Sequence, residues 1–199
     1  GILLYGPPGT GKSSTVIAIA GELRMNVCML SLASSTISDD SLQGYLNCAP
    51  LNSIILLVDV DCALSSEEKE TPDAQANQMM LMMGRRGTKS LTFAGILNAL
   101  DGVASQEGRI LFMTTNHIEK LDPALIRPGR IDLRVKFELA SSDQIRLMFL
   151  RFFPGEEKKA DKVATAIPDH RISTAQLQGF FLLHRKDAAA VLPDTPRVL

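Results

Sequence analysis

Cysteine and net charge are both scarce in this sequence. Only three cysteines occur in 199 residues, Cys28, Cys48 and Cys62, and none belongs to a Cys-x-x-Cys pair. An odd number without paired spacing argues against a disulfide framework and favours buried thiols in a reducing compartment. The formal net charge is −1, so no overall field attracts the chain to nucleic acid or to anionic membranes.

Long hydrophobic runs are also missing. No apolar stretch approaches the roughly 20 residues that a membrane-spanning helix needs, and there is no signal or transit peptide. The chain opens inside the apolar run GILLYG without a methionine, so we expect a fragment, and the lack of targeting or membrane segments in it proves little. The composition, 45% hydrophobic and 22% charged, is typical of a globular protein long enough for one domain or one and a half.

Strands alternate with helices over the first 140 residues. Apolar runs predict strands at 2–5, 26–32, 53–59, 109–116 and 134–139, and helical spacing predicts helices at 12–23, 38–46 and 91–102, the last one stopped by Gly102. Three helical patterns follow without a strand, at 142–153, 156–167 and 173–187. We therefore expect a parallel five-stranded α/β domain at 1–140 and a small helical domain at 141–199.

A polar, charged and Met-rich stretch interrupts this alternation at residues 64–90. It lacks the apolar content of a core, which predicts a flexible insertion. Its methionines at 79, 80, 82 and 83 form either a sticky surface or part of a loop that packs back on the domain.

A glycine-rich loop follows the first strand. Gly6, Gly11, Lys12 and Ser13 fit the pattern G-x-x-x-x-G-K-[ST]. Glycines let the backbone approach a phosphate closely, and the helix N-terminus after the loop favours an anion. Lysine neutralises β/γ-phosphate oxygens and the serine hydroxyl ligates Mg²⁺. We expect ATP to be held by the whole loop, which consists of Gly6, Pro7, Pro8, Gly9, Thr10, Gly11, Lys12, Ser13 and Ser14.

Acidic and amide side chains end two of the later strands. Asp59 and Asp61 follow the apolar run of the third strand, and on an extended chain they would face the same way. Asn116 follows the fourth strand, where it could orient a water or touch the γ-phosphate. Because ligands in such sheets lie at the carboxyl ends of strands, we expect Asp59 to be a catalytic base or, with Ser13, a Mg²⁺ ligand.

Two arginines follow in the segment LDPALIRPGRID, residues 121–132. Arg127 and Arg130 flank Pro128 and Gly129. A guanidinium suits the spread charge of a phosphoryl group, and such arginines can act on a nucleotide held by a neighbouring subunit. If this segment is considered alone, the better interpretation is that the two arginines form salt bridges on the surface.

Together these segments resemble the AAA family of ATPases. The resemblance rests on GILLYGPPGTGKSS, SIILLVDVDCA, LTFAGILNALDGV, ILFMTTN and KLDPALIRPGRID, and the stretches 97–130 and 173–187 resemble its mitochondrial Bcs-type chaperones and their fungal relatives. It implies a P-loop NTPase three-layer α/β/α sandwich followed by a helical lid. It also implies hydrolysis of ATP with Mg²⁺, Asn116 in the sensor-one position, and Arg127 and Arg130 in the arginine-finger positions.

The same resemblance implies partners and a location. Bcs-type proteins form rings, heptameric in that branch, with the nucleotide between subunits. They insert a Rieske-type client protein into a respiratory complex, and an N-terminal helix anchors them in the mitochondrial inner membrane. This chain would therefore meet a membrane only through a segment upstream of it, and it would bind no nucleic acid.

One residue departs from the family pattern. Bcs-type strands end in E-D-x-D, whereas this sequence reads Val58-Asp59-Val60-Asp61, and a valine can neither bind water nor carry charge. ATP binding should survive, because Ser13 and the phosphates still hold Mg²⁺, but hydrolysis should be slow. The leading hypothesis is an ATP-driven chaperone or translocase; the alternatives are a degenerate ring that binds ATP without using it, and a nucleic-acid remodeller.

Overall fold

The computed structural model describes residues 1–34, 37–64, 91–104 and 108–197. Apart from Leu64, the predicted insertion with its methionines lies outside these residues. Contacts divide the chain into two compact units, one of residues 1–5 and 13–135, the other of residues 6–12 and 136–199. Among the described residues, no helix is both long and apolar enough to cross a membrane.

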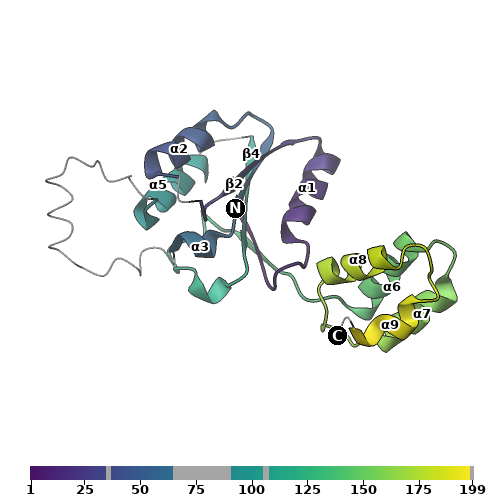
Figure 1. Ribbon diagram of the computed structural model, residues 1–199. Helices are drawn as coiled ribbons and strands as arrows, with labels where there is room; N and C mark the ends of the chain where they lie inside the picture. Colours follow the sequence, from purple (N-terminus) through teal and green to yellow (C-terminus); the bar gives the residue numbers. More distant parts are fainter. Residues whose placement is uncertain (35–36, 65–90, 105–107, 198–199) are drawn as a thin grey trace, which may run out of the picture. The chain divides into compact units, whose positions relative to one another are not determined.

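The first unit is built on a five-stranded sheet with the strand order β2-β3-β4-β1-β5 (Figure 1). Its strands are β1 (Ile2–Tyr5), β2 (Asn26–Ser31), β3 (Ser53–Val58), β4 (Arg109–Thr115) and β5 (Leu133–Lys136). The pairs β1–β4, β3–β4 and β2–β3 are all parallel. Tyr5 lies opposite Thr115, and Leu57 lies opposite Met113. The carboxyl ends of the central strands therefore meet at one edge of the sheet.

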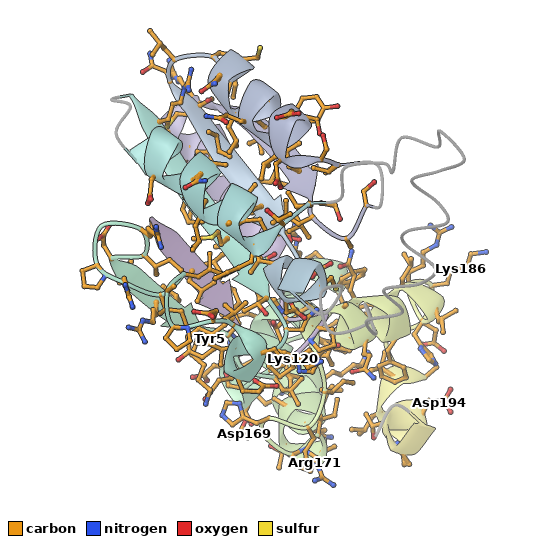
Figure 2. All side chains as sticks on the ribbon, turned by 90° about the vertical axis from the view of Figure 1, so that its left-hand side faces the viewer. Tyr5, Lys120, Asp169, Arg171, Lys186 and Asp194 are labelled. Atoms are coloured by element: carbon orange, nitrogen blue, oxygen red, sulfur yellow. The ribbon has the colours of Figure 1, made fainter. Side chains whose placement is uncertain are left out.

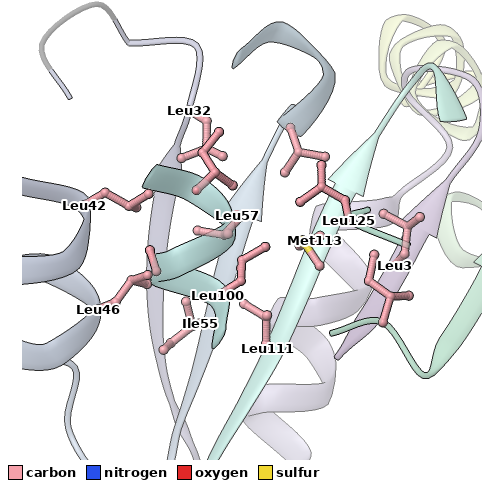
Figure 3. Packing of buried hydrophobic residues seen from close by; sticks show 14 of the residues in the cluster. Leu3, Leu32, Leu42, Leu46, Ile55, Leu57, Leu100, Leu111, Met113 and Leu125 are labelled. Atoms are coloured by element: carbon pink, nitrogen blue, oxygen red, sulfur yellow. The ribbon is translucent and has the colours of Figure 1, made fainter. Parts of the chain in front are cut away.

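Helices cover both faces of this sheet (Figure 1). They are α1 (Lys12–Leu23), α2 (Asp39–Cys48), α3 (Val60–Leu64) and α5 (Phe93–Ala104). Helices α2 and α5 pack on the face that carries Ile55, Leu57 and Met113, and Figure 3 shows this cluster from close by. Alternate residues such as Leu56 are equally buried and face the opposite side, where Figure 1 places α1.

The second unit contains the helical appendage. Its helices are α6 (Ser142–Phe152), α7 (Glu157–Ala166), α8 (Thr174–Leu183) and the short α9 (Val191–Asp194). Ser141 and Ser173 cap α6 and α8, each in a reciprocal capping box with the glutamine three residues later. The core contains an edge-to-face pair of Phe149 and Phe181 with ring centroids 5.6 Å apart. The predicted parallel α/β sheet with a helical lid is thus confirmed, while α9 was not predicted.

Several predicted boundaries are wrong, and two of them have a clear cause. Helix α5 does not stop at Gly102 but runs on to Ala104, because Gly102 lacks the positive φ that a C-capping glycine adopts. The last strand ends at Lys136 instead of residue 139. The reason lies in Ala140, whose N–H donates to Ile172 O at 2.8 Å and whose carbonyl accepts from His170 N at 2.9 Å. Residues 137–140 therefore lead to the helical unit and do not extend the strand.

Candidate nucleotide-binding and catalytic site

The glycine-rich loop has the backbone that the sequence predicts. Gly6, Gly9 and Gly11 all have positive φ, at 138°, 74° and 94°, a region that side-chain-bearing residues rarely adopt. A Cβ on Gly6 would lie 2.0 Å from the carbonyl oxygen of Phe137, so only glycine fits there. Helix α1 begins directly after this loop and carries no acidic residue in its first turn. The N–H groups and the dipole of this helix end therefore favour an anion, and no carboxylate of that turn opposes them.

Lys12 places a positive charge within the loop. The side chain is only 7% exposed, and Nζ donates to the carbonyls of Gly6 at 2.7 Å and Pro7 at 2.8 Å. An ammonium removed from water in this way is a strong partner for a polyphosphate. Thr10 Oγ1 also donates to Pro7 O, at 2.8 Å, which fixes the loop entry. The residues present thus fit the phosphate chain of a nucleotide.

The outer side of the loop is bonded to the start of α8. Gly9 O accepts from Thr174 Oγ1 and from Ala175 N, both at 2.9 Å. A Cβ on Gly9 would lie 3.0 Å from Ser173 Oγ, so the packing is close. These two bonds tie the loop directly to the first turn of a lid helix.

Asp59 lies at a sharp corner between β3 and α3. The strand ends at Val58, Asp59 has a φ of 54°, and α3 begins at Val60. Aspartate tolerates this left-handed conformation better than most residues. The prediction that Asp59 and Asp61 share a face of an extended chain is therefore wrong, because the chain turns between them.

Threonines at the end of β4 hold both aspartates. Thr115 Oγ1 donates to the buried Asp61 Oδ1 at 2.7 Å, and Thr114 Oγ1 accepts from Asp59 N at 3.4 Å. Asn116 Nδ2 donates to Asp59 Oδ1 at 3.4 Å. The structure thus brings together Asp59 and Asn116, two of the predicted catalytic residues, and ties the buried Asp61 to Thr115 at the end of β4.

The two predicted arginines have different surroundings. Arg130 forms a bidentate ion pair with Asp101 of α5, from Nε at 2.6 Å and from Nη2 at 2.7 Å. This pair raises the pKa of Arg130 and lowers that of Asp101. Arg127 is exposed. In the described part of the chain, no hydrogen bond or ion pair of the Arg127 side chain is found.

A thiol lies beside the aspartates. Burial, and then the charges of Asp61 and Asp59, raise the pKa of Cys62, while Lys120 opposes this effect. In Figure 2, Lys120 and Tyr5, the last residue of β1, are labelled. Within the described residues, no cluster of three or more His, Cys, Asp or Glu side chains could hold a metal ion by itself.

Sequence reasoning missed three positions of this site: Asp101, Thr115 and Thr174. Thr115 could have been found, since two threonines end an otherwise apolar strand. Asp101 could not, because it is 29 residues away from Arg130 and only the folded chain brings the two together.

The parallel sheet, the glycine loop before α1 and the acidic strand end define the class of P-loop nucleotide-binding α/β proteins. Residues 2–139 match the family described as "ATPase family associated with various cellular activities (AAA)", and residues 142–195 match "Mitochondrial chaperone BCS1-like, ATPase lid domain". The chain belongs to the AAA family of ATPases. Membership of this family implies nucleotide binding and, in general, ATPase activity.

Similar proteins are called mitochondrial chaperones. The chain is 49% identical to "Mitochondrial chaperone BCS1" of Bos taurus over 98% of its own length. It is 45% identical to "Probable mitochondrial chaperone BCS1-B" of Dictyostelium discoideum over 94%, and 42% identical to "Probable mitochondrial chaperone bcs1" of Schizosaccharomyces pombe over 98%. It spans 45%, 44% and 42% of these relatives, respectively, so it corresponds to less than half of each.

Proposed function

We propose that this chain is the ATP-driven module of a mitochondrial inner-membrane chaperone or translocase. The observation that carries the proposal is the buried ammonium of Lys12 inside a loop of three positive-φ glycines, directly before a helix N-terminus. The names of the relatives support the cellular role. The proposed client is a Rieske-type protein, and the proposed assembly is a ring, heptameric by resemblance, with nucleotide between subunits. Residues 1–140 would bind and hydrolyse ATP, and residues 141–199 would form the lid.

Each site residue has a proposed task. The loop of residues 6–14 binds the phosphates, Lys12 neutralises them, and Asp59 activates the attacking water with Asn116 orienting it. Arg127 and Arg130 belong to the segment that acts on the nucleotide of a neighbouring subunit. Ser13 and Asp59 are the residues that would hold Mg²⁺, which supplies charge neutralisation of the phosphates when bound.

A second candidate function is favoured by Val58. This residue ends β3 at the position where the family resemblance implies a glutamate, so one carboxylate is missing from the strand end. A chain that binds ATP but hydrolyses it slowly would serve as a nucleotide-stabilised scaffold.

Steady-state phosphate release by the purified chain separates the two functions. If the missing acid limits turnover, Val58→Glu should raise the rate by about 100-fold, the usual size of a lost electrostatic group. Val58→Gln, which has a similar length but no charge, should leave it unchanged. A wild-type rate in both variants would mean that the valine is compensated, and the slow-hydrolysis hypothesis would then be wrong.

A further inference from the structure

Val58 ends β3 on the face of the sheet that α1 covers. Leu57 belongs to the cluster under α2 and α5, and side chains alternate along a strand, so Val58 faces the other way, as Leu56 does. Helix α1 lies on that side (Figure 1), and its second residue is Ser13. A side chain at position 58 therefore points to the side of the sheet where the helix with this serine hydroxyl lies.

The neighbour of Val58 on this face is also uncharged. Leu57 lies opposite Met113 in the parallel pair of β3 and β4, so Thr114 is the next residue in register with Val58. Thr114 is 1% exposed, and its Oγ1 accepts from Asp59 N at 3.4 Å. The end of β3 thus presents a methyl-bearing side chain and a hydroxyl on the side of α1, with no carboxylate between them.

Both aspartates that follow Val58 lie beyond the strand. The chain turns at Asp59, whose φ is 54°, and Asp59 Oδ1 accepts from Asn116 Nδ2 at 3.4 Å. Asp61 is 5% exposed, and its Oδ1 accepts from Thr115 Oγ1 at 2.7 Å. Neither aspartate continues the alternation of β3, so neither replaces a carboxylate at position 58.

A carboxylate at this position would affect a nucleotide in two opposite ways. It would repel the negative charges of a metal-free triphosphate, and it would help to hold Mg²⁺ when that ion is bound. The valine removes both effects. The ammonium of Lys12, which donates to the carbonyls of Gly6 and Pro7, attracts phosphates whether or not a metal accompanies them.

We infer that Val58 makes the nucleotide site accept metal-free nucleoside triphosphate about as well as its Mg²⁺ complex. The site then selects the polyphosphate and not the metal ion. Ser13 and Asp59 remain the residues that would touch Mg²⁺, but the ion adds little to the affinity. This inference rests on the proposed function, because it concerns the form of ATP that the same loop binds.

Calorimetric titration in excess Mg²⁺ and in excess EDTA measures the two affinities. The ligand is a non-hydrolysable ATP analogue, so that turnover adds no heat. Wild type is compared with Val58→Glu and with the matched control Val58→Gln, which has the shape of glutamate without its charge. The melting temperature without ligand shows that each form is folded in each buffer.

The charge at position 58 should decide the effect of the metal. Wild type and Val58→Gln should have affinities that differ by less than about tenfold between the two buffers. Val58→Glu should bind the metal-free analogue at least about tenfold more weakly than Val58→Gln does, because a like charge beside the phosphates opposes binding. In Mg²⁺, its affinity should equal or exceed that of Val58→Gln.

Other results overturn the inference. A wild-type affinity more than about tenfold higher in Mg²⁺ than in EDTA would show that the metal is held without the missing acid. Equal affinities of folded Val58→Glu and Val58→Gln in EDTA would show that residue 58 does not face the phosphates. If Val58→Glu does not fold, Val58→Asp and its control Val58→Asn take the same two places.

Failure of the proposed function gives a different result. A folded wild-type chain without a calorimetric signal in either buffer removes the nucleotide site itself, and the inference with it. Binding that occurs only in Mg²⁺ removes the inference and leaves the proposed function standing.

Discussion

Asp39 at the start of α2 holds the N-terminus of α5 through Thr92. Its Oδ1 accepts from Thr92 N at 2.7 Å and its Oδ2 accepts from Thr92 Oγ1 at 2.8 Å. Thr92 Oγ1 in turn accepts from Gly95 N at 3.0 Å. A carboxylate at a helix N-terminus is stabilised by the helix dipole, and this one fixes α2 against the helix that carries Asp101.

The first prediction concerns two glycines of α5. A Cβ on Gly95 would lie 2.1 Å from the carboxylate of Asp39, whereas a Cβ on Gly102 would meet nothing within 4 Å. Gly95→Ala must therefore displace Asp39 from Thr92, at a cost of about 1–3 kcal/mol in the free energy of unfolding. Gly102→Ala should stabilise by about 0.5–1 kcal/mol, because alanine is the better helix former.

Urea denaturation of both variants checks this first prediction. The same substitution in the same helix gives opposite signs only if the Asp39–Thr92 contact exists. Equal stability of the two variants would contradict it.

The second prediction concerns the ammonium of Lys12. Lys12→Ala should weaken Mg·ATP binding by at least roughly 10- to 100-fold, since hydrogen bonds to charged groups contribute about 1.5–3 kcal/mol. The control Lys158→Ala removes an exposed lysine of α7 and should change nothing. Calorimetry gives the affinities. If Lys12→Ala bound Mg·ATP as tightly as wild type, the loop would not be a phosphate site.

The parts of the structure that sequence predicts best are those with local causes. The bounds of β1 and α1 agree with the predicted 2–5 and 12–23, because an apolar run, three glycines and helical spacing each act within a few residues. The turn at Asp59 and the pair of Asp101 with Arg130 have non-local causes. A turn made by the single residue Asp59 produces no periodic pattern in the sequence. Asp101 and Arg130 are 29 residues apart, and no spacing rule predicts an ion pair over that separation.

The third prediction uses Cys62 as a probe of the strand-end charges. Because Asp61 raises the pKa of Cys62 and Lys120 lowers it, Asp61→Asn should increase the thiolate fraction at pH 8 and Lys120→Gln should decrease it. The thiolate is the reactive form, so alkylation by iodoacetamide should become faster in the first variant and slower in the second.

Mass spectrometry of the two cysteine peptides resolves these rates. The exposed Cys48, at the end of α2, serves as the internal control and should react equally in all forms. Changes of the same sign at Cys62 in both variants would point to altered access instead of charge, and would contradict the prediction.

The fourth prediction concerns the hydroxyl of Thr115. It donates to Asp61 and also accepts from His117 N at 2.9 Å, so it fixes the turn that carries Asn116. Thr115→Val has nearly the same volume but removes both bonds, and should cost about 1–3 kcal/mol in stability. Because Asn116 would then shift from Asp59, turnover should fall by up to about 100-fold while affinity for Mg·ATP changes little.

Two comparisons make this effect specific. Thr165→Val, on the exposed face of α7, removes a hydroxyl that donates to Asp161 O within its own helix, and should leave turnover unchanged. Thr115→Ser keeps the hydroxyl and should restore turnover relative to Thr115→Val. A loss of turnover in Thr115→Ser as large as in Thr115→Val would assign the effect to the lost methyl group, and the hydroxyl would then have no part in placing Asn116.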